Sequence, residues 1–362
     1  MSYSFQETLY DGGLTPDLGQ VRFKLDTNEN CLGMSHSVRE KLINHSFNLS
    51  RYPDRTYARL KNKIADYHDI QIEGITVGAG SWSLLDLIAK VFQSSHGITG
   101  IFKYGFQGFY YAAKKHNHKI YIFEEPDYFD RLRASEIDLP NGLKLIFIAN
   151  PGNPTGIKLT TTQLTDFVKS LANDTVLVVD EAYIEYTEDH KNSSALKLVK
   201  SFPNVIVVRT FSKIYGLAGF RVGWCYSSPR IAGYIQAIEL PYGLTDIAQE
   251  AAIFALEEHK HVETSRAYNM KARERIEKCL KELEFSFISS QANFIAADFS
   301  KYPRTPEKFK KLGLLYRNLA VYNMPGWMRL TIGCDAANEL LIEGINHLRM
   351  DRFPKGKQTS LS

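Results

Sequence analysis

A lysine and an aspartate each follow an apolar run of the sequence, where a buried strand would end. Lys213 comes shortly after the run 204–208 (NVIVV) and precedes a glycine-bearing segment. A lysine near apolar residues can lose its charge and act as an amine nucleophile that forms a Schiff base. Asp180 ends the run 175–179 (TVLVV), so its carboxylate needs a cationic or hydrogen-bonding partner. A protonated pyridine nitrogen, a metal ion or a helix N-terminus would each satisfy it.

Two turns of unusual composition accompany these residues. The segment 150–156 (NPGNPTG) holds two prolines and two glycines after an apolar run, which indicates a rigid turn that aims the amide of Asn153 at a ligand. The segment 78–83 (GAGSWS) precedes a helical pattern, and free backbone N–H groups there would bind an anion. It lacks the third small residue of a dinucleotide fingerprint, and no acidic residue follows about twenty positions on. The segment therefore favours a phosphate over a nicotinamide dinucleotide.

The elements that must position these residues alternate between strand and helix. Apolar runs typical of strands covered on both faces occur at 75–77, 143–149, 175–179, 204–208 and 222–226. Helical apolar spacing occurs at 83–92 and 161–171. This alternation predicts a mostly parallel α/β sheet. Ligands bind at the carboxyl ends of such strands, so the side chains described above should meet there.

The pattern changes from about residue 246. We expect helices, two short strands and a closing helix at 248–258, 265–283, 294–298, 328–332 and 338–349. These form a second, smaller α+β unit. The predicted division is a large domain at 40–245, and an N-terminal arm and small domain at 1–39 and 246–362.

Composition argues against several classes of protein. The 362 residues carry 44 basic and 40 acidic side chains, a net charge of +4 that is too small for a typical nucleic-acid binder. No run approaches the roughly 18 apolar residues of a membrane helix, and the N-terminus lacks the pattern of a secretory signal. Four cysteines lie far apart and no HExxH occurs, which predicts reduced cytosolic thiols and no metal site.

Several stretches, in their order and spacing, resemble the fold-type-I pyridoxal-phosphate enzymes of the class I/II aminotransferase superfamily. The resemblance extends from 24 to about 348 and is greatest to the histidinol-phosphate aminotransferase branch. The matching stretches are 24–30 (KLDTNEN), 51–54 (RYPD), 149–156 (ANPGNPTG), 178–186 (VVDEAYIEY), 209–224 (RTFSKIYGLAGFRVGW) and 328–333 (MRLTIG). It implies an α/β fold with an aspartate-aminotransferase-like large domain around a mostly parallel sheet, and a smaller α+β domain.

The resemblance also implies roles for individual residues. Lys213 would bind the aldehyde of pyridoxal 5'-phosphate and move the proton at the substrate's Cα, and Asp180 would pair with the ring nitrogen. Other cofactor contacts would come from Asn153 and Tyr183 at the phenolic oxygen, from Phe106 stacked on the ring, and from Gly80, Ser81, Trp82, Ser212 and Arg221 at the phosphate. Tyr52 would reach the cofactor phosphate of a neighbouring subunit, which implies a homodimer.

The substrate site is expected near Asn30, Leu32, Arg317 and Arg329. Arg317 and Arg329 resemble the family's arginines that hold the far end of the substrate, and a planar guanidinium suits this role because it binds a carboxylate or phosphate with two hydrogen bonds. Where the family usually continues with proline and an aromatic residue, this chain has Cys31 and Leu32, and it has Trp82 at a position that is often acidic.

The predicted function is a cytoplasmic aminotransferase of histidine biosynthesis. Its donor would be a phosphorylated or carboxylated amine and its acceptor 2-oxoglutarate, with no nucleic-acid or membrane partner. The alternatives are a decarboxylase of a phosphorylated amino acid such as threonine phosphate, a nicotinamide-dependent oxidoreductase, and a non-catalytic regulatory domain on the same fold.

Overall fold

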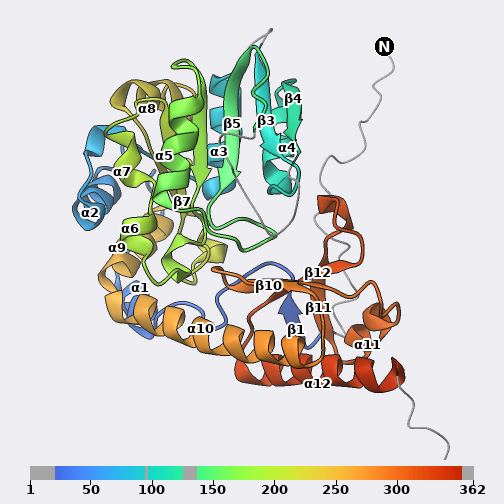
Figure 1. Ribbon diagram of the computed structural model, residues 1–362. Helices are drawn as coiled ribbons and strands as arrows, with labels where there is room; N and C mark the ends of the chain where they lie inside the picture. The colour runs from blue at the N-terminus through green and yellow to red at the C-terminus, as the bar shows by residue number, and fades with distance from the viewer. Residues whose placement is uncertain (1–20, 94–96, 125–136, 353–362) are drawn as a thin grey trace, which may run out of the picture.

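The computed structural model describes residues 21–93, 97–124 and 137–352 (Figure 1). The expectation about a secretory signal concerns the first residues of the chain and lies outside this part, as do the ends 1–20 and 353–362 of the predicted second domain. Two sheets organise the described residues, one in the upper half of Figure 1 and one in the lower half. In the described part of the chain, no helix has the length and apolar character needed to cross a membrane.

The larger sheet has seven strands in the order β2-β8-β7-β6-β5-β3-β4. Strand β8 runs antiparallel to β2 and β7, and the other neighbours are parallel. The sheet is therefore mostly parallel, as predicted. Its strands are β2 (Ile75–Gly78), β3 (Ile98–Phe102), β4 (Lys119–Phe123), β5 (Leu143–Ala149), β6 (Val176–Asp180), β7 (Val205–Thr210) and β8 (Gly223–Tyr226).

Helices cover both faces of this sheet, which explains the uninterrupted apolar strands. On one face, side chains at alternate positions of β5, β6 and β7 pack against α3 (Ser81–Val91), α4 (Gln107–Lys115) and α8 (Pro229–Gln236). On the other, the intervening positions pack into a core with α2 (Ala58–His68), α5 (Thr161–Ser170), α7 (Leu196–Val199) and α9 (Asp246–Glu257). Shorter elements near this sheet are α1 (His36–Asn44), α6 (His190–Ser193), η2 (Ile72–Gly74), η4 (Ile184–Tyr186) and η5 (Ala218–Phe220).

The smaller sheet has five strands in the order β1-β11-β12-β10-β9. Strand β1 pairs parallel with β11, and the other pairs are antiparallel. The long helix α10 packs on α12 along one side of this unit (Figure 1). Its elements are β1 (Phe23–Leu25), α10 (His259–Glu282), β9 (Phe287–Ile288), β10 (Phe294–Asp298), α11 (Thr305–Lys311), β11 (Leu314–Asn318), η6 (Ala320–Tyr322), β12 (Trp327–Thr331) and α12 (Asp335–Arg352).

The division of the chain at 40–245 stays a prediction. Helix α9 begins near the predicted boundary at 246, and its buried side chains belong to the core of the larger sheet, next to α1 and α2. Helix α10, which follows, has most of its apolar buried side chains in the core of the smaller sheet. The chain therefore passes from the core of the larger sheet to the core of the smaller sheet near residue 258.

Close backbone approach at one glycine positions the beginning of α3. A Cβ atom at Gly223 would lie 2.5 Å from the backbone nitrogen of Ser81, a separation that real side chains do not reach. Glycine at this position thus lets β8 pass directly beside the N-terminus of α3. The predicted anion-binding segment is held against the edge of the larger sheet in this way.

Candidate active site

A cavity of about 260 Å³ lies at the carboxyl ends of the parallel strands, next to the smaller sheet. Most of the residues predicted for the site line it. These are Ser81, Trp82, Phe106, Asn153, Asp180, Tyr183, Ser212, Lys213, Arg221, Arg317 and Arg329. They come from segments far apart in the sequence, and they converge because neighbouring parallel strands end at one edge of the sheet.

The amine of Lys213 lies in a poorly solvated environment with charges of both signs, from Arg329 and Arg221 and from Glu29 and Asp180. Its Nζ donates a hydrogen bond to the backbone oxygen of Thr27 at 2.8 Å and lies 5.6 Å from the centroid of the Tyr183 ring. Burial, followed by the positive charge of Arg329, lowers the pKa of Lys213 to about 7. A neutral amine is therefore available near neutral pH, as nucleophilic chemistry requires.

Asp180 is the last residue of β6 and is only 5% exposed. Its Oδ1 accepts a hydrogen bond from the backbone nitrogen of Ala182 at 3.1 Å. Burial raises the pKa of Asp180 to about 7, although the hydrogen bond and the charge of Lys213 both oppose the rise. One hydrogen bond and one nearby charge offset only part of the cost of burying this carboxylate. A cationic group of a ligand beside Asp180 would therefore stabilise its ionised form.

The amides of Asn28 and Asn153 and the phenol of Tyr183 form another part of the cavity lining. Asn153 accepts a hydrogen bond from Arg329 Nη1 at its Oδ1, with a distance of 2.5 Å, and its Nδ2 lies 3.4 Å from the hydroxyl of Tyr183. Asn28 Nδ2 donates to the same hydroxyl at 3.0 Å. Burial raises the pKa of Tyr183 to about 12, so the phenol is protonated at neutral pH.

One end of the cavity is built to hold an anion. Helix α3 begins at Ser81, and Gly80 before it has a φ of +83°, a conformation that favours glycine. A Cβ atom at Gly80 would also overlap the guanidinium of Arg221, so glycine lets that side chain approach the helix N-terminus. Arg221 Nη1 lies 3.3 Å from Ser212 Oγ and donates to the backbone oxygen of Ala218 at 2.8 Å. Backbone N–H groups, a hydroxyl and a guanidinium thus meet at one place.

An aromatic wall closes one side of the cavity. The rings of Trp82 and Phe106 meet edge to face with centroids 5.5 Å apart, and Phe106 makes a similar contact with Phe109 at 5.5 Å. Trp82 and Phe106 line the cavity, whereas Phe109 is fully buried behind them. This packing holds Phe106 where it can cover a flat ring.

The opposite end carries two arginines from neighbouring strands. Arg317 on β11 and Arg329 on β12 are directly paired in register, and both line the cavity. Arg329 is 5% exposed and donates through Nη2 to the backbone oxygen of Asp26. Its Nε is buried without a hydrogen-bond partner in the described part of the chain. Arg329 lines the cavity, so its guanidinium can offer charge-assisted hydrogen bonds to an anionic ligand there.

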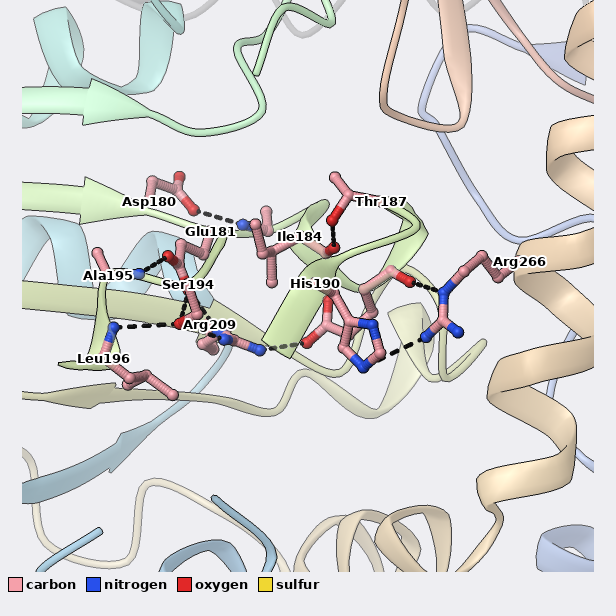
Figure 2. Close-up of polar contacts among 12 residues, drawn as sticks. Asp180, Glu181, Ile184, Thr187, His190, Ser194, Ala195, Leu196, Arg209 and Arg266 are labelled. Atoms are coloured by element: carbon pink, nitrogen blue, oxygen red, sulfur yellow. Dashed lines mark hydrogen bonds and ion pairs between the residues drawn. The ribbon is translucent and has the colours of Figure 1, made fainter. Parts of the chain in front are cut away.

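The buried Arg209 of β7 contacts the segment after β6 that carries Asp180 and Tyr183 (Figure 2). Arg209 donates through Nε to Glu181 at 2.8 Å, through Nη1 to Glu185 at 2.8 Å, and through Nη2 to the hydroxyl of Ser194 at 2.9 Å. All of these side chains are buried. A buried guanidinium that uses its three nitrogens in this way holds its partners in one geometry.

The two glutamates that Arg209 binds are close in the sequence to site residues. Glu181 follows Asp180, and Glu185 lies two residues after Tyr183, so Arg209 fixes both ends of the segment between them. From α10, Arg266 Nε donates to the backbone oxygen of Glu185 at 2.6 Å (Figure 2). The segment after β6 is thus held by the larger sheet and by the helix that leads into the smaller unit.

Four predicted residues do not line the cavity. Tyr52 is 81% exposed and stacks on Tyr242 with ring centroids 4.6 Å apart, and Leu32 is 39% exposed. Asn30 donates through Nδ2 to the backbone oxygen of Ile214 at 2.8 Å and to Ser265 Oγ at 3.0 Å. Gly80 acts through its backbone conformation rather than by lining the cavity.

Sequence analysis missed several lining residues. Asp26, Thr27, Asn28 and Glu29 belong to one segment, and Tyr322 follows from the smaller unit. The segment was visible as part of the stretch 24–30 that carries the family resemblance, but only Asn30 of it was assigned to the site. Among the described residues, no group of histidine, cysteine, aspartate and glutamate side chains forms a metal site.

The chain belongs to the aminotransferase class I and II family, whose model matches residues 21–345. It is 34% identical to histidinol-phosphate aminotransferase 1 of Psychrobacter arcticus, over 91% of this chain and 88% of that protein. It is also 34% identical to histidinol-phosphate aminotransferase 1 of Mannheimia succiniciproducens, over 89% and 88%. The family resemblance inferred from the sequence is confirmed.

A solved structure shows the same fold. The histidinol-phosphate aminotransferase of Sinorhizobium meliloti, determined in complex with pyridoxal-5'-phosphate, superposes with a TM-score of 0.83 at 24% identity and covers 92% of each chain. The predicted fold class, an aspartate-aminotransferase-like α/β domain with a smaller α+β domain, agrees with this likeness.

Proposed function

We propose that this protein is a pyridoxal-phosphate-dependent aminotransferase of histidine biosynthesis that transfers an amino group between histidinol phosphate and a 2-oxo acid such as 2-oxoglutarate. Family membership and two curated relatives at 34% identity support the reaction and the substrate. The observation that carries the proposal is the meeting of Lys213 and Asp180 in one cavity, each with a pKa moved to about 7.

The residues fit the cofactor. The buried carboxylate of Asp180 favours a cationic partner, and a protonated pyridine nitrogen supplies one. The phosphate would lie at the N-terminus of α3 with Ser212 and Arg221, where backbone N–H groups and a guanidinium converge. Phe106 would cover the ring, and Asn153 and Tyr183 would face its phenolic oxygen.

When bound, pyridoxal phosphate supplies an aldehyde that captures amines and a ring that withdraws electrons from the substrate's Cα. Lys213 would hold the aldehyde through its Nζ, and its free amine would be the base that carries the Cα proton of the substrate. The carboxylate of Asp180 would pair with the ring nitrogen and keep that nitrogen protonated. Tyr183 and Asn153 would orient the ring through its phenolic oxygen.

Arg317 and Arg329 would select the amino donor by the anionic group at the end away from its amine. Both arginines line the cavity and present two guanidinium groups to a ligand there. A dianionic phosphate can accept charge-assisted hydrogen bonds from both arginines at once, and these bonds are stronger than bonds to a neutral hydroxyl. The same pair would also bind the distal carboxylate of 2-oxoglutarate in the second half of the reaction.

We also propose a cytoplasmic homodimer in which Tyr52 reaches the neighbouring site. Tyr52 and Leu240 are strongly exposed, and Tyr242 stacks on Tyr52, so these residues present apolar surface to a partner. The four cysteines are free thiols, as expected in a reducing compartment. Sedimentation equilibrium measures the oligomeric state, and a monomer at micromolar concentration contradicts the dimer.

Borohydride reduction tests the assignment of Lys213. The purified protein with pyridoxal phosphate should absorb visible light, and reduction should fix the cofactor on the peptide that contains Lys213. Lys213→Ala should lose turnover, whereas Lys158→Ala should not, because Lys158 bonds to Ser193 Oγ at 2.9 Å outside the cavity. Labelling of a different lysine would overturn the assignment.

Product analysis separates this function from the alternatives. With histidinol phosphate and 2-oxoglutarate we expect glutamate, and with threonine phosphate we expect no carbon dioxide. Carbon dioxide release without glutamate formation would favour the decarboxylase, and the absence of any turnover with bound cofactor would favour a regulatory domain. The nicotinamide-dependent oxidoreductase receives no support, because the matched family is that of aminotransferases.

A further inference from the structure

Asn28 is the most tightly bonded residue of the segment that sequence analysis left unassigned. It is 1% exposed and adopts a left-handed backbone conformation with a φ of +56°. Asparagine and glycine tolerate this conformation better than most residues. The position therefore combines a demanding backbone with a buried amide that needs hydrogen-bond partners.

Each polar group of Asn28 has such a partner. Its backbone nitrogen donates to Thr331 Oγ1 at 3.1 Å, and its backbone oxygen accepts from Asn293 Nδ2 at 3.1 Å. The side-chain Oδ1 lies 3.0 Å from the Thr331 hydroxyl, which shares its proton between this oxygen and the backbone oxygen of Leu25 at 2.9 Å. Nδ2 donates to the hydroxyl of Tyr183 at 3.0 Å. In this arrangement the oxygen of the amide faces the smaller sheet and its NH₂ group faces the phenol.

The hydroxyl of Tyr183 receives a second amide from the other side. Asn153 Nδ2 lies 3.4 Å from it, and this amide is oriented by Arg329, which donates to Asn153 Oδ1. A hydroxyl oxygen has two acceptor sites and one proton. With both acceptor sites turned to amide donors, the proton of Tyr183 is left to donate. In the described part of the chain, no protein atom accepts it, and Tyr183 lines the cavity.

We propose that Asn28 is a positioning residue that fixes the Tyr183 hydroxyl as a hydrogen-bond donor into the cavity, toward the phenolic oxygen of the cofactor. The inference rests on the proposed function, since it requires a pyridoxal ring beside Tyr183. A donated hydrogen bond stabilises an ionised phenolic oxygen relative to a protonated one. Asn28 would thereby lower the pH at which the bound cofactor's visible absorption band changes.

Two substitutions separate this role from a merely structural one. Asn28→Asp keeps the shape and tolerates the backbone, but it replaces the donor with an acceptor that would attract the Tyr183 proton away from the cavity. Asn28→Gly fits the left-handed backbone and removes the amide. A structural role predicts that aspartate is the milder change, whereas the proposed role predicts that it is the more harmful one.

The holoenzyme is titrated by visible absorption, and the dissociation constant for pyridoxal phosphate is measured alongside. In Asn28→Gly we expect the midpoint of the absorption change to rise by about 0.4 to 1 pH unit, which corresponds to the net contribution of one hydrogen bond. In Asn28→Asp the rise should be larger, with weaker cofactor binding. In a Tyr183→Phe background, the neutral substitution Asn28→Gly should leave the midpoint unchanged.

Asn338→Ala is the matched control. Asn338 is a buried asparagine that bonds to both backbone groups of Gly333, at 2.8 Å and 2.7 Å, and does not line the cavity. Its removal should leave the midpoint unchanged. A shift of Asn28→Gly that persists in Tyr183→Phe, or a smaller shift in Asn28→Asp than in Asn28→Gly, would overturn the inference.

If Asn28→Asp does not fold, the comparison of Asn28→Gly alone and in Tyr183→Phe decides the question, because an unchanged midpoint in the wild-type background contradicts the proposed role. Failure of the underlying function is seen separately. Wild-type protein that binds no pyridoxal phosphate would overturn the proposed function, and the inference with it. Wild-type protein that binds the cofactor while Asn28→Gly matches it in every measurement would overturn the inference only.

Discussion

Removal of Arg329 should reduce the preference of the enzyme for a phosphorylated donor. Arg329 is 5% exposed, pairs in register with Arg317, and lines the cavity. A hydrogen bond to a charged group contributes about 1.5–3 kcal/mol. At about 1.4 kcal/mol per factor of ten, Arg329→Ala should therefore lower kcat/KM for histidinol phosphate by about 10- to 150-fold more than for histidinol.

The ratio between the two donors is the informative quantity. Arg329 also orients Asn153, so its removal disturbs the cofactor's surroundings and slows turnover with either donor. This shared effect cancels when the two kcat/KM values are divided. Arg230→Ala is the control, since Arg230 lies on the surface and contacts Tyr234. An equal loss with histidinol phosphate and histidinol would refute the assignment of Arg329 to the distal anion.

Two further predictions concern the buried charges. Asp180 has a folded pKa of about 7, above its unfolded value near 3.8, so the folded protein retains a proton there and its contribution to stability is lost as pH rises from about 4 to 7. In cofactor-free protein, the melting temperature of Asp180→Asn relative to wild type should therefore increase over this range, and a constant difference contradicts the assigned pKa. The same variant should also turn over more slowly, because its barrier should rise by several kcal/mol at about 1.4 kcal/mol per factor of ten in kcat. Arg209→Ala leaves Glu181 and Glu185 buried without their cation and should lower the free energy of unfolding by about 3–5 kcal/mol, measured by urea denaturation, whereas Arg230→Ala should change it little.

The central part of the site was predictable because its residues stand at strand ends. Asp180 ends β6, Asn153 follows β5 and Lys213 follows β7, and these three strands are neighbours in the sheet. Apolar runs marked the strands, and parallel pairing brought their carboxyl ends together. Strands β5 and β10 occupy the predicted ranges, and β12 is displaced by one residue.

Sequence analysis missed strands β3 and β4 although both are apolar, with the sequences ITGIF and KIYIF, because each run has only five residues and β3 is interrupted by a glycine. It also missed β1 and β9, which have only three and two residues. Asn28 was missed for a different reason. Its role depends on contacts with Tyr183, which is 155 residues away, and with Thr331, which is 303 residues away. Spacing within a sequence carries no information about such pairs, whereas the family stretch around Asn28 marked the segment without giving its partners.

The arginines at the two ends of the cavity have a second effect on the residue between them. Arg329 and Arg221 both lower the pKa of Lys213, because each places a positive charge near its amine. These are the groups that would bind the distal anion of the substrate and the phosphate of the cofactor. Each bound anion offsets part of this positive charge, so the pKa of the free Lys213 amine should rise when both anions are present. The two anion sites thus influence how readily Lys213 takes up a proton, which is the step that the proposed reaction assigns to it.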